Sequence, residues 1–167
     1  IGLGTVQFGV MYGISNEYGQ TPETEVSSIL SYANEVGINV LDTASAYGNS
    51  EKVLGSNDLS VFKIVSKFIV QNSGTEISNH LNDSLADLKV KSIYGYLSHR
   101  PMDIASDSKR WNELVLLKSQ GLVEKIGFSF NEVSEIEKIK SLNIIPDIIQ
   151  VPYNYLDNRF EPYMTEL

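Results

Sequence analysis

The 167-residue sequence contains no cysteine. It therefore has no disulfide bond and no thiolate metal ligand, as is typical of a protein from a reducing compartment. Its two histidines, His80 and His99, lie in different segments without the spacing of metal ligands. No apolar run approaches the roughly 18 residues of a membrane span. We therefore expect neither a metal site nor membrane insertion.

Basic residues are also scarce. Thirteen Lys and Arg stand against 21 Asp and Glu, a formal net charge of −8. Nucleic-acid binding is not expected, because phosphate neutralisation needs clustered positive charge. With 42% hydrophobic and 20% charged residues, the composition is that of a globular domain with a core. The first residues do not resemble a secretory signal, so we predict a cytoplasmic protein.

Strand-like and helix-like segments alternate along the chain, which predicts βα units around a parallel sheet. We expect strands over residues 1–8, 40–42, 62–70, 92–98, 123–130 and 147–153. The expected helices cover residues 22–36, 50–54, 77–88, 107–119 and 133–142. The first should have Thr21 as its N-cap and Pro22 as its first residue, and the fourth should bury Trp111, Leu114 and Val115. No linker or sequence repeat interrupts this order, so we predict a single domain over residues 1–167.

The stretch from residue 39 to residue 55 is the most informative. Val40 and Leu41 lead into Asp42 as a short buried strand, and Tyr47 follows in a turn of small residues. A carboxylate and a phenol would then lie at the C-terminal end of a strand. In α/β folds that edge of the sheet binds ligands.

Four motifs resemble those of the aldo-keto reductases, in the same order. They are Gly2-Leu-Gly-Thr5-Val-Gln-Phe-Gly9, Asp42-Thr-Ala-x-x-Tyr47-Gly-x-Ser50-Glu51-x-x-Leu54-Gly55, the strand with Lys67, and Leu97-Ser-His99-Arg-Pro101. The resemblance implies a (β/α)8 TIM barrel that uses a nicotinamide cofactor. Such a barrel has eight strands and typically about 250 residues. We therefore expect an incomplete barrel of about six βα units, truncated at both ends.

The resemblance also implies roles for four side chains. Tyr47 would donate a proton to the carbonyl oxygen during reduction. Lys67 would lower the pKa of that phenol, and Asp42 would pair with the ammonium group. His99 would orient the carbonyl and stabilise negative charge on its oxygen.

Each of these residues also has an ordinary structural interpretation. Tyr47 could pack in its loop, Lys67 could extend from a strand end into water, and His99 could belong to the core or a turn. Asp42 could cap the turn that follows its strand. Their order and joint spacing favour the site over four unrelated coincidences.

The cofactor residues follow from the same resemblance. Gly4, Thr5, Asp42, Ser129 and Gln150 match positions that lie near the nicotinamide in the family. Asn131 is as consistent with a helix N-cap as with a cofactor ligand. NADP(H) is favoured over NAD(H), although the seventh and eighth strands, which bind the 2′-phosphate in the family, have no counterpart here.

The predicted function is the reduction of an aldehyde or ketone, with a small carbonyl compound as partner. The run from Gln150 to Phe160 resembles family members linked to surface polysaccharides, a hint of a sugar-like substrate. Two alternatives stay open: a lyase or aldolase with Lys67 as a Schiff-base nucleophile, and a cofactor-binding regulatory subunit. The sequence does not indicate an oligomeric state.

Overall fold

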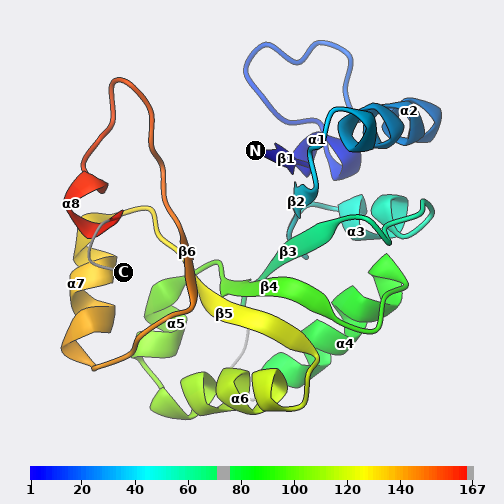
Figure 1. Cartoon of the computed structure of the whole chain (residues 1–167). Helices are drawn as coiled ribbons and strands as arrows, with labels where there is room; N and C mark the ends of the chain where they lie inside the picture. The colour runs from blue at the N-terminus through cyan, green and yellow to red at the C-terminus, as the bar shows by residue number, and fades with distance from the viewer. Residues whose placement is uncertain (71–75, 165–167) are drawn as a thin grey trace.

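The computed structural model describes residues 1–70 and 76–164. Its centre is one sheet of six parallel strands, in the same order in the sheet as in the chain (Figure 1). The strands are β1 (Gly2–Gly4), β2 (Val40–Asp42), β3 (Lys63–Phe68), β4 (Ile93–Ser98), β5 (Val123–Ser129) and β6 (Ile148–Gln150). This is an incomplete (β/α)8 barrel, as predicted from the sequence.

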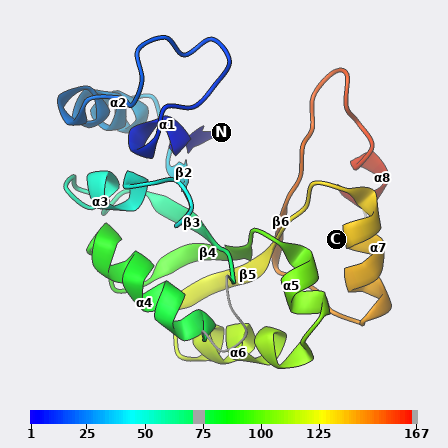
Figure 2. The same cartoon turned by 180° about the vertical axis from the view of Figure 1, so that it is seen from behind.

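Helices follow every strand and lie outside the curled sheet (Figures 1 and 2). The longer ones are α2 (Glu23–Glu35), α4 (Ile77–Leu88), α6 (Ser108–Ser119) and α7 (Val133–Ser141). Four short helices lie in the connections: α1 (Val6–Gly9), α3 (Ser50–Leu54), α5 (Pro101–Ala105) and α8 (Glu161–Met164). Within the described residues, no helix has the length and apolar character to cross a membrane.

The two faces of the sheet have different environments, because successive side chains of a strand point to opposite faces. On β3, Ile64 and Phe68 face the helices and belong to the main apolar core, which Tyr96 and Phe128 extend from β4 and β5. Val65, on the other face of β3, lines a hollow of about 410 Å³ on the concave side of the sheet. The core therefore lies between the sheet and its helices.

The parallel register brings the C-terminal ends of the strands to one edge. Gly4 is opposite Asp42, Lys67 is opposite Leu97, and Ser129 is opposite Gln150. Residues that are far apart in the sequence therefore meet at this edge.

The first strand is shorter than predicted. Thr5 ends it by donating its N–H to the Asp42 carbonyl at 2.9 Å, and Phe8 then donates to the Thr5 carbonyl at 2.9 Å. This turn begins helix α1, which the sequence did not indicate. Gly9 at its end packs so closely that an added Cβ would lie 1.7 Å from the Tyr47 carbonyl oxygen.

Several other boundaries also differ from the predicted ones. Pro22, not Thr21, occupies the N-cap position of α2. Leu114 is buried on α6 but Val115 is 45% exposed, so its predicted inward position is wrong. Glu132 is the N-cap residue of α7. The interpretation of Asn131 as the N-cap residue is therefore wrong by one position.

Candidate active site

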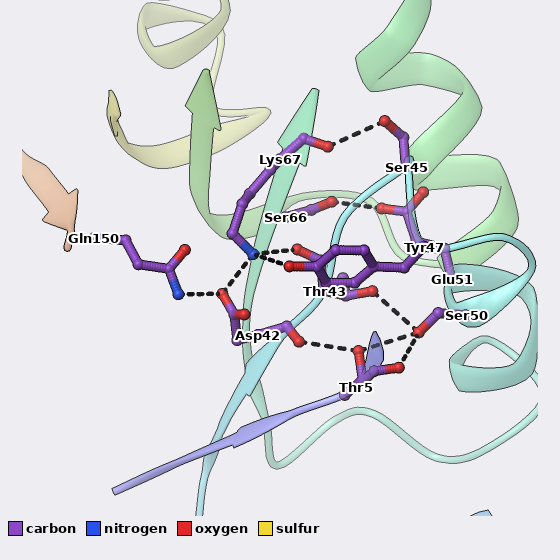
Figure 3. A network of polar contacts seen from close by, with 10 residues as sticks. All are labelled: Thr5, Asp42, Thr43, Ser45, Tyr47, Ser50, Glu51, Ser66, Lys67 and Gln150. Atoms are coloured by element: carbon purple, nitrogen blue, oxygen red, sulfur yellow. Dashed lines mark hydrogen bonds and ion pairs between the residues drawn. The ribbon is translucent and has the colours of Figure 1, made fainter. Parts of the chain in front are cut away.

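The four predicted catalytic side chains come together at the C-terminal edge of the sheet. Asp42 is the last residue of β2, Lys67 lies near the end of β3, and His99 directly follows β4. Tyr47 lies in the turn between β2 and α3. Lys67 lies between Asp42 and Tyr47 (Figure 3). His99 contacts the ring of Tyr47.

The ammonium group of Lys67 is the hub of the site. Its Nζ lies 2.7 Å from Asp42 Oδ1, 2.8 Å from the Thr43 carbonyl oxygen and 3.5 Å from the Tyr47 hydroxyl oxygen. Lys67 is only 1% exposed. Its head group is thus inside the protein, which removes the interpretation of a lysine that extends into water.

Burial and charge act in opposite directions on Lys67. Burial lowers its pKa, because the charged form loses hydration, and Asp42 opposes this by attraction and by its hydrogen bond. The balance leaves the pKa of Lys67 below its ordinary value. A salt bridge at 2.7 Å nevertheless favours the ammonium form.

His99 lies beside the phenol ring of Tyr47. The two ring centroids are 6.0 Å apart and the planes meet at 83°. Burial lowers the pKa of His99, and the nearby Lys67 cation lowers it further. A neutral imidazole at pH 7 follows, because the ordinary value is already near 6.5.

The pKa of Tyr47 differs in direction from the expectation. Burial raises it, and the negative charge of Asp42 raises it further. Lys67 was expected to lower it, but the 3.5 Å separation is long for a hydrogen bond. Tyr47 is therefore a protonated phenol at neutral pH, as a proton donor must be.

The backbone around Tyr47 is tied to two neighbouring strand ends. Ser50 Oγ donates to the Thr5 carbonyl at 2.9 Å and lies 3.2 Å from Thr43 Oγ1. Gly48 has a φ of +59°, a conformation that glycine adopts without strain. These contacts fix the turn that carries the phenol.

The five residues expected near a nicotinamide have different environments. Gln150 Nε2 donates to Asp42 Oδ1 at 3.1 Å, and Gly4, Asp42 and Gln150 line the concave hollow. Thr5 is fully buried, and its hydroxyl donates to the Asp42 carbonyl at 2.9 Å. Ser129 is partly buried at the end of β5.

Two buried polar atoms at this edge have no partner among the described residues. They are Gln150 Oε1 and His99 Nδ1. Buried polar atoms normally form hydrogen bonds, so an unpaired one calls for an explanation. Gln150 Oε1 could accept a hydrogen bond from a carboxamide, so the residues present fit the nicotinamide group.

Glu51 lies within the sequence motif from Asp42 to Gly55 and had no role assigned to it from the sequence. The structure shows it 5% exposed, with hydrogen bonds from Ser66 and Ser84. Its place in this motif was the one feature of the sequence that could have marked Glu51 as part of the site. No group of three or more His, Cys, Asp or Glu in residues 1–70 and 76–164 could hold a metal ion.

This part of a parallel α/β barrel has Asp42, Lys67 and His99 at the strand ends and Tyr47 in the following turn, which defines a class of barrel proteins with a polar site at the C-terminal edge of the sheet. Comparison with known proteins identifies the family within that class. The model of the aldo/keto reductase family matches residues 1–167. The chain therefore belongs to the aldo/keto reductase family.

Individual relatives agree with this assignment. Methylglyoxal reductase DkgA of Yersinia pestis is 31% identical over 136 residues, which are 77% of this chain and 48% of that protein. PA4992 of Pseudomonas aeruginosa, assigned to the aldo-keto reductases, has 30% identity and a TM-score of 0.81, over 99% of this chain and 67% of that one. The chain thus spans about half the length of its curated relative.

A more distant neighbour shares the fold. An aldo-keto reductase of Klebsiella pneumoniae, solved in complex with NADPH, is 19% identical with a TM-score of 0.77. The match covers 99% of this chain and 59% of that one.

Proposed function

We propose that the complete protein reduces an aldehyde or ketone to an alcohol, with a small carbonyl compound as its substrate. A reduced nicotinamide cofactor, when bound, supplies the hydride. The residues of this chain then have to orient the carbonyl group and deliver a proton to its oxygen.

The contacts of Lys67 are the observation that carries this proposal. They bring Asp42 and Tyr47 to one ammonium group, and His99 lies beside the same phenol. Tyr47 is the general acid and gives its hydroxyl proton to the carbonyl oxygen. Lys67, held by Asp42, stabilises the phenolate that remains. Neutral His99 donates a hydrogen bond to the carbonyl and stabilises its developing charge.

The cofactor would lie over the concave hollow beside Gly4, Asp42, Ser129 and Gln150. Gln150 Oε1, buried and unpaired, is the acceptor for the nicotinamide carboxamide. NADP(H) is proposed ahead of NAD(H), and the NADPH complex of the Klebsiella neighbour supports trying it first.

The substrate proposal has two sources. The DkgA relative is named as a methylglyoxal reductase, which favours small 2-oxoaldehydes. The run from Gln150 to Phe160 resembles family members linked to surface polysaccharides, which favours sugar carbonyls. Both classes present an unhindered carbonyl to one proton donor. A cytoplasmic location completes the proposal, since NADPH-dependent reductions draw on an intracellular cofactor.

The alternative roles make different demands on the site. A Schiff-base mechanism needs an uncharged lysine, but the 2.7 Å contact with Asp42 favours the ammonium form of Lys67. A regulatory subunit would bind the cofactor without turnover.

A fluorescence titration of the full-length protein with NADPH and NADH tests the proposal first. A panel of methylglyoxal, other aldehydes and sugar carbonyls then follows, with cofactor oxidation as the readout. Saturable binding with carbonyl-dependent oxidation is the expected result. Binding without oxidation would support the regulatory role, and borohydride trapping of a lysine adduct would support the Schiff-base enzyme.

A further inference from the structure

Glu51 is a buried carboxylate outside the four proposed catalytic side chains. It is 5% exposed, although acidic residues are almost never buried without partners. Both of its oxygens accept a hydrogen bond: Oε1 from Ser66 Oγ at 2.5 Å and Oε2 from Ser84 Oγ at 3.0 Å. Burial raises the pKa of Glu51, while these two hydrogen bonds and the Lys67 cation oppose the rise and favour the ionised form of the carboxylate. Keeping such a charge inside is costly, so its position calls for a reason.

The partners of Glu51 connect three elements behind the site. Glu51 belongs to α3, Ser66 to β3 and Ser84 to α4. Ser66 precedes Lys67 in β3, and neighbouring strand residues point to opposite faces. Glu51 thus holds α3 against the outer face of β3, at the point where Lys67 projects from the inner face (Figure 3).

The segment that carries Tyr47 is joined to β3 at its other end as well. Ser45 donates both its N–H and its Oγ to the Lys67 carbonyl, at 3.0 Å and 3.1 Å. Tyr47 lies between Ser45 and Glu51 in the sequence. The position of its hydroxyl group is therefore set by the hydrogen bonds of Ser45 to the Lys67 carbonyl on one side and by the hydrogen bond between Glu51 and Ser66 on the other.

Glu51 also adds a second negative charge near Lys67. Burial lowers the pKa of Lys67, while the attraction of Asp42 and then of Glu51 opposes this. Asp42 acts from the inner face of the sheet and Glu51 from the outer. A Lys67 without Glu51 would lose its proton at a lower pH.

We propose that Glu51 is a positioning residue, whose buried carboxylate fixes Tyr47 against β3 and keeps Lys67 charged. This inference rests on the proposed reductase function, in which Tyr47 and Lys67 work as a pair. Three other ionisable groups face Glu51 from the elements packed on it: Lys67 on β3, Asp87 on α4 and Tyr96 on β4. Among these, Lys67 is the only cation.

The test is Glu51→Gln in the full-length protein, which removes the charge and keeps the side-chain size. Nuclear magnetic resonance of the 13Cε of Lys67, assigned with Lys67→Met, gives the titration of the ammonium group without cofactor or substrate. We expect this titration at a pH lower by about 0.5 or more. We also expect kcat to fall roughly tenfold through misplacement of the phenol, with the KM for NADPH changed less than about twofold.

Asp87→Asn is the matched control, because it makes the same chemical change on the neighbouring α4. Asp87 has a 38% exposed side chain, 3.9 Å from Lys52. The Lys67 titration and kcat should both match the wild type in this variant.

An unchanged Lys67 titration in Glu51→Gln would overturn the proposal, even with lowered stability and activity, since packing alone would explain such losses. If Glu51→Gln does not fold, Glu51→Asp is the second test of the proposal. We expect this variant to have a near-native Lys67 titration and a kcat several-fold below that of the wild type. A native kcat would contradict the proposal. A wild type without carbonyl reduction would reject the reductase function, while the lysine titration would still report on Glu51.

Discussion

At the scale of single residues, Lys67 connects the parts of the site. Its ammonium group contacts a carboxylate, a backbone carbonyl and a phenol within 3.5 Å. A phenol is protonated at neutral pH, and burial and Asp42 raise the pKa of Tyr47 further. In the proposed mechanism this phenol donates its proton, and the Lys67 cation beside it stabilises the phenolate that forms.

Tyr47→Phe removes the proton donor and keeps the aromatic ring beside His99. We expect the rate of carbonyl reduction to fall roughly 10²–10⁴-fold, the usual contribution of a general acid. The Kd for NADPH, measured by fluorescence, should stay close to that of the wild type. Tyr32→Phe is the control, because Tyr32 is 65% exposed on α2. A loss below tenfold for Tyr47→Phe would contradict the assigned role.

Lys67→Met tests the electrostatic partner of the phenol. Without the cation, Asp42 acts on Tyr47 unopposed, so the phenolate becomes less stable and the pKa of Tyr47 rises. Reduction needs protonated Tyr47, so the decline of activity on the alkaline side should move to higher pH, at a lower maximal rate. Lys63→Met, at the start of the same strand, should leave the pH profile in place. A native profile for Lys67→Met would reject the partnership.

At the scale of elements, close packing of α1 against the Tyr47 turn positions the phenol. An added Cβ on Gly9 would lie 1.7 Å from the Tyr47 carbonyl oxygen and 2.5 Å from the Ser50 nitrogen. Real Cβ atoms do not approach backbone atoms so closely, so Gly9→Ala must displace the turn.

We therefore expect Gly9→Ala to lower the free energy of unfolding by about 1–3 kcal/mol. Carbonyl reduction should decrease as well, because the phenol moves relative to Lys67. Chemical denaturation and steady-state kinetics measure the two effects. At Gly2, an added Cβ would meet its nearest atom at 3.5 Å, an ordinary contact. Gly2→Ala should thus be close to native, and equal behaviour of the two variants would refute the argument.

Strands and helices with a strong local pattern were predictable from the sequence. β3 and β4 lie within their predicted ranges, and α4 has its predicted bounds because its leucines recur at helical spacing. Residues 6–8, which begin α1, were misassigned as strand, because so short a segment has no pattern that separates a strand from a helical turn. What decides between them is the contact of Gly9 with the Tyr47 turn, which lies far away in the sequence.

The candidate site shows the same division between local and distant information. A family motif and the strand ends predicted Asp42, Tyr47, Lys67 and His99 as site residues, and the structure brings the four side chains together. The burial of Glu51 could not be predicted from the sequence, because its partners Ser66 and Ser84 are 15 and 33 residues away. Only the packing of α3 and α4 on β3 brings these hydroxyl groups to the carboxylate.

At the scale of the whole molecule, a few long-range polar contacts hold distant parts of the curled sheet together. Gln150 on β6 reaches Asp42 on β2, 108 residues away in the sequence. At the opposite end of β6, Lys118 Nζ lies 2.6 Å and 2.7 Å from the two oxygens of Asp147, and the Ile126 N–H donates to Asp147 at 3.0 Å. Asp147 therefore joins α6, β5 and the start of β6.

Asp147 should make the stability of the fold depend on acid. Burial raises the pKa of Asp147, but the hydrogen bonds from Lys118 and Ile126 outweigh this and hold it below its ordinary value. A carboxyl group with a depressed pKa in the folded state stabilises the protein above its unfolded pKa, near 4. That contribution is lost as the pH falls through the lower, folded value.

Asp147→Asn should thus lower the free energy of unfolding by about 1 kcal/mol at pH 7. The difference from the wild type should begin to shrink below about pH 4, where the unfolded-state carboxyl takes up a proton, and should disappear as the pH falls through the lower pKa of the folded-state carboxyl. Urea denaturation at several pH values measures both quantities. The exposed pair Lys52–Asp87, at 3.9 Å, provides the comparison, and Asp87→Asn should cost less than about 0.5 kcal/mol. A cost for Asp147→Asn that stays constant from pH 7 to pH 3 would show that shape, rather than charge, sets its contribution.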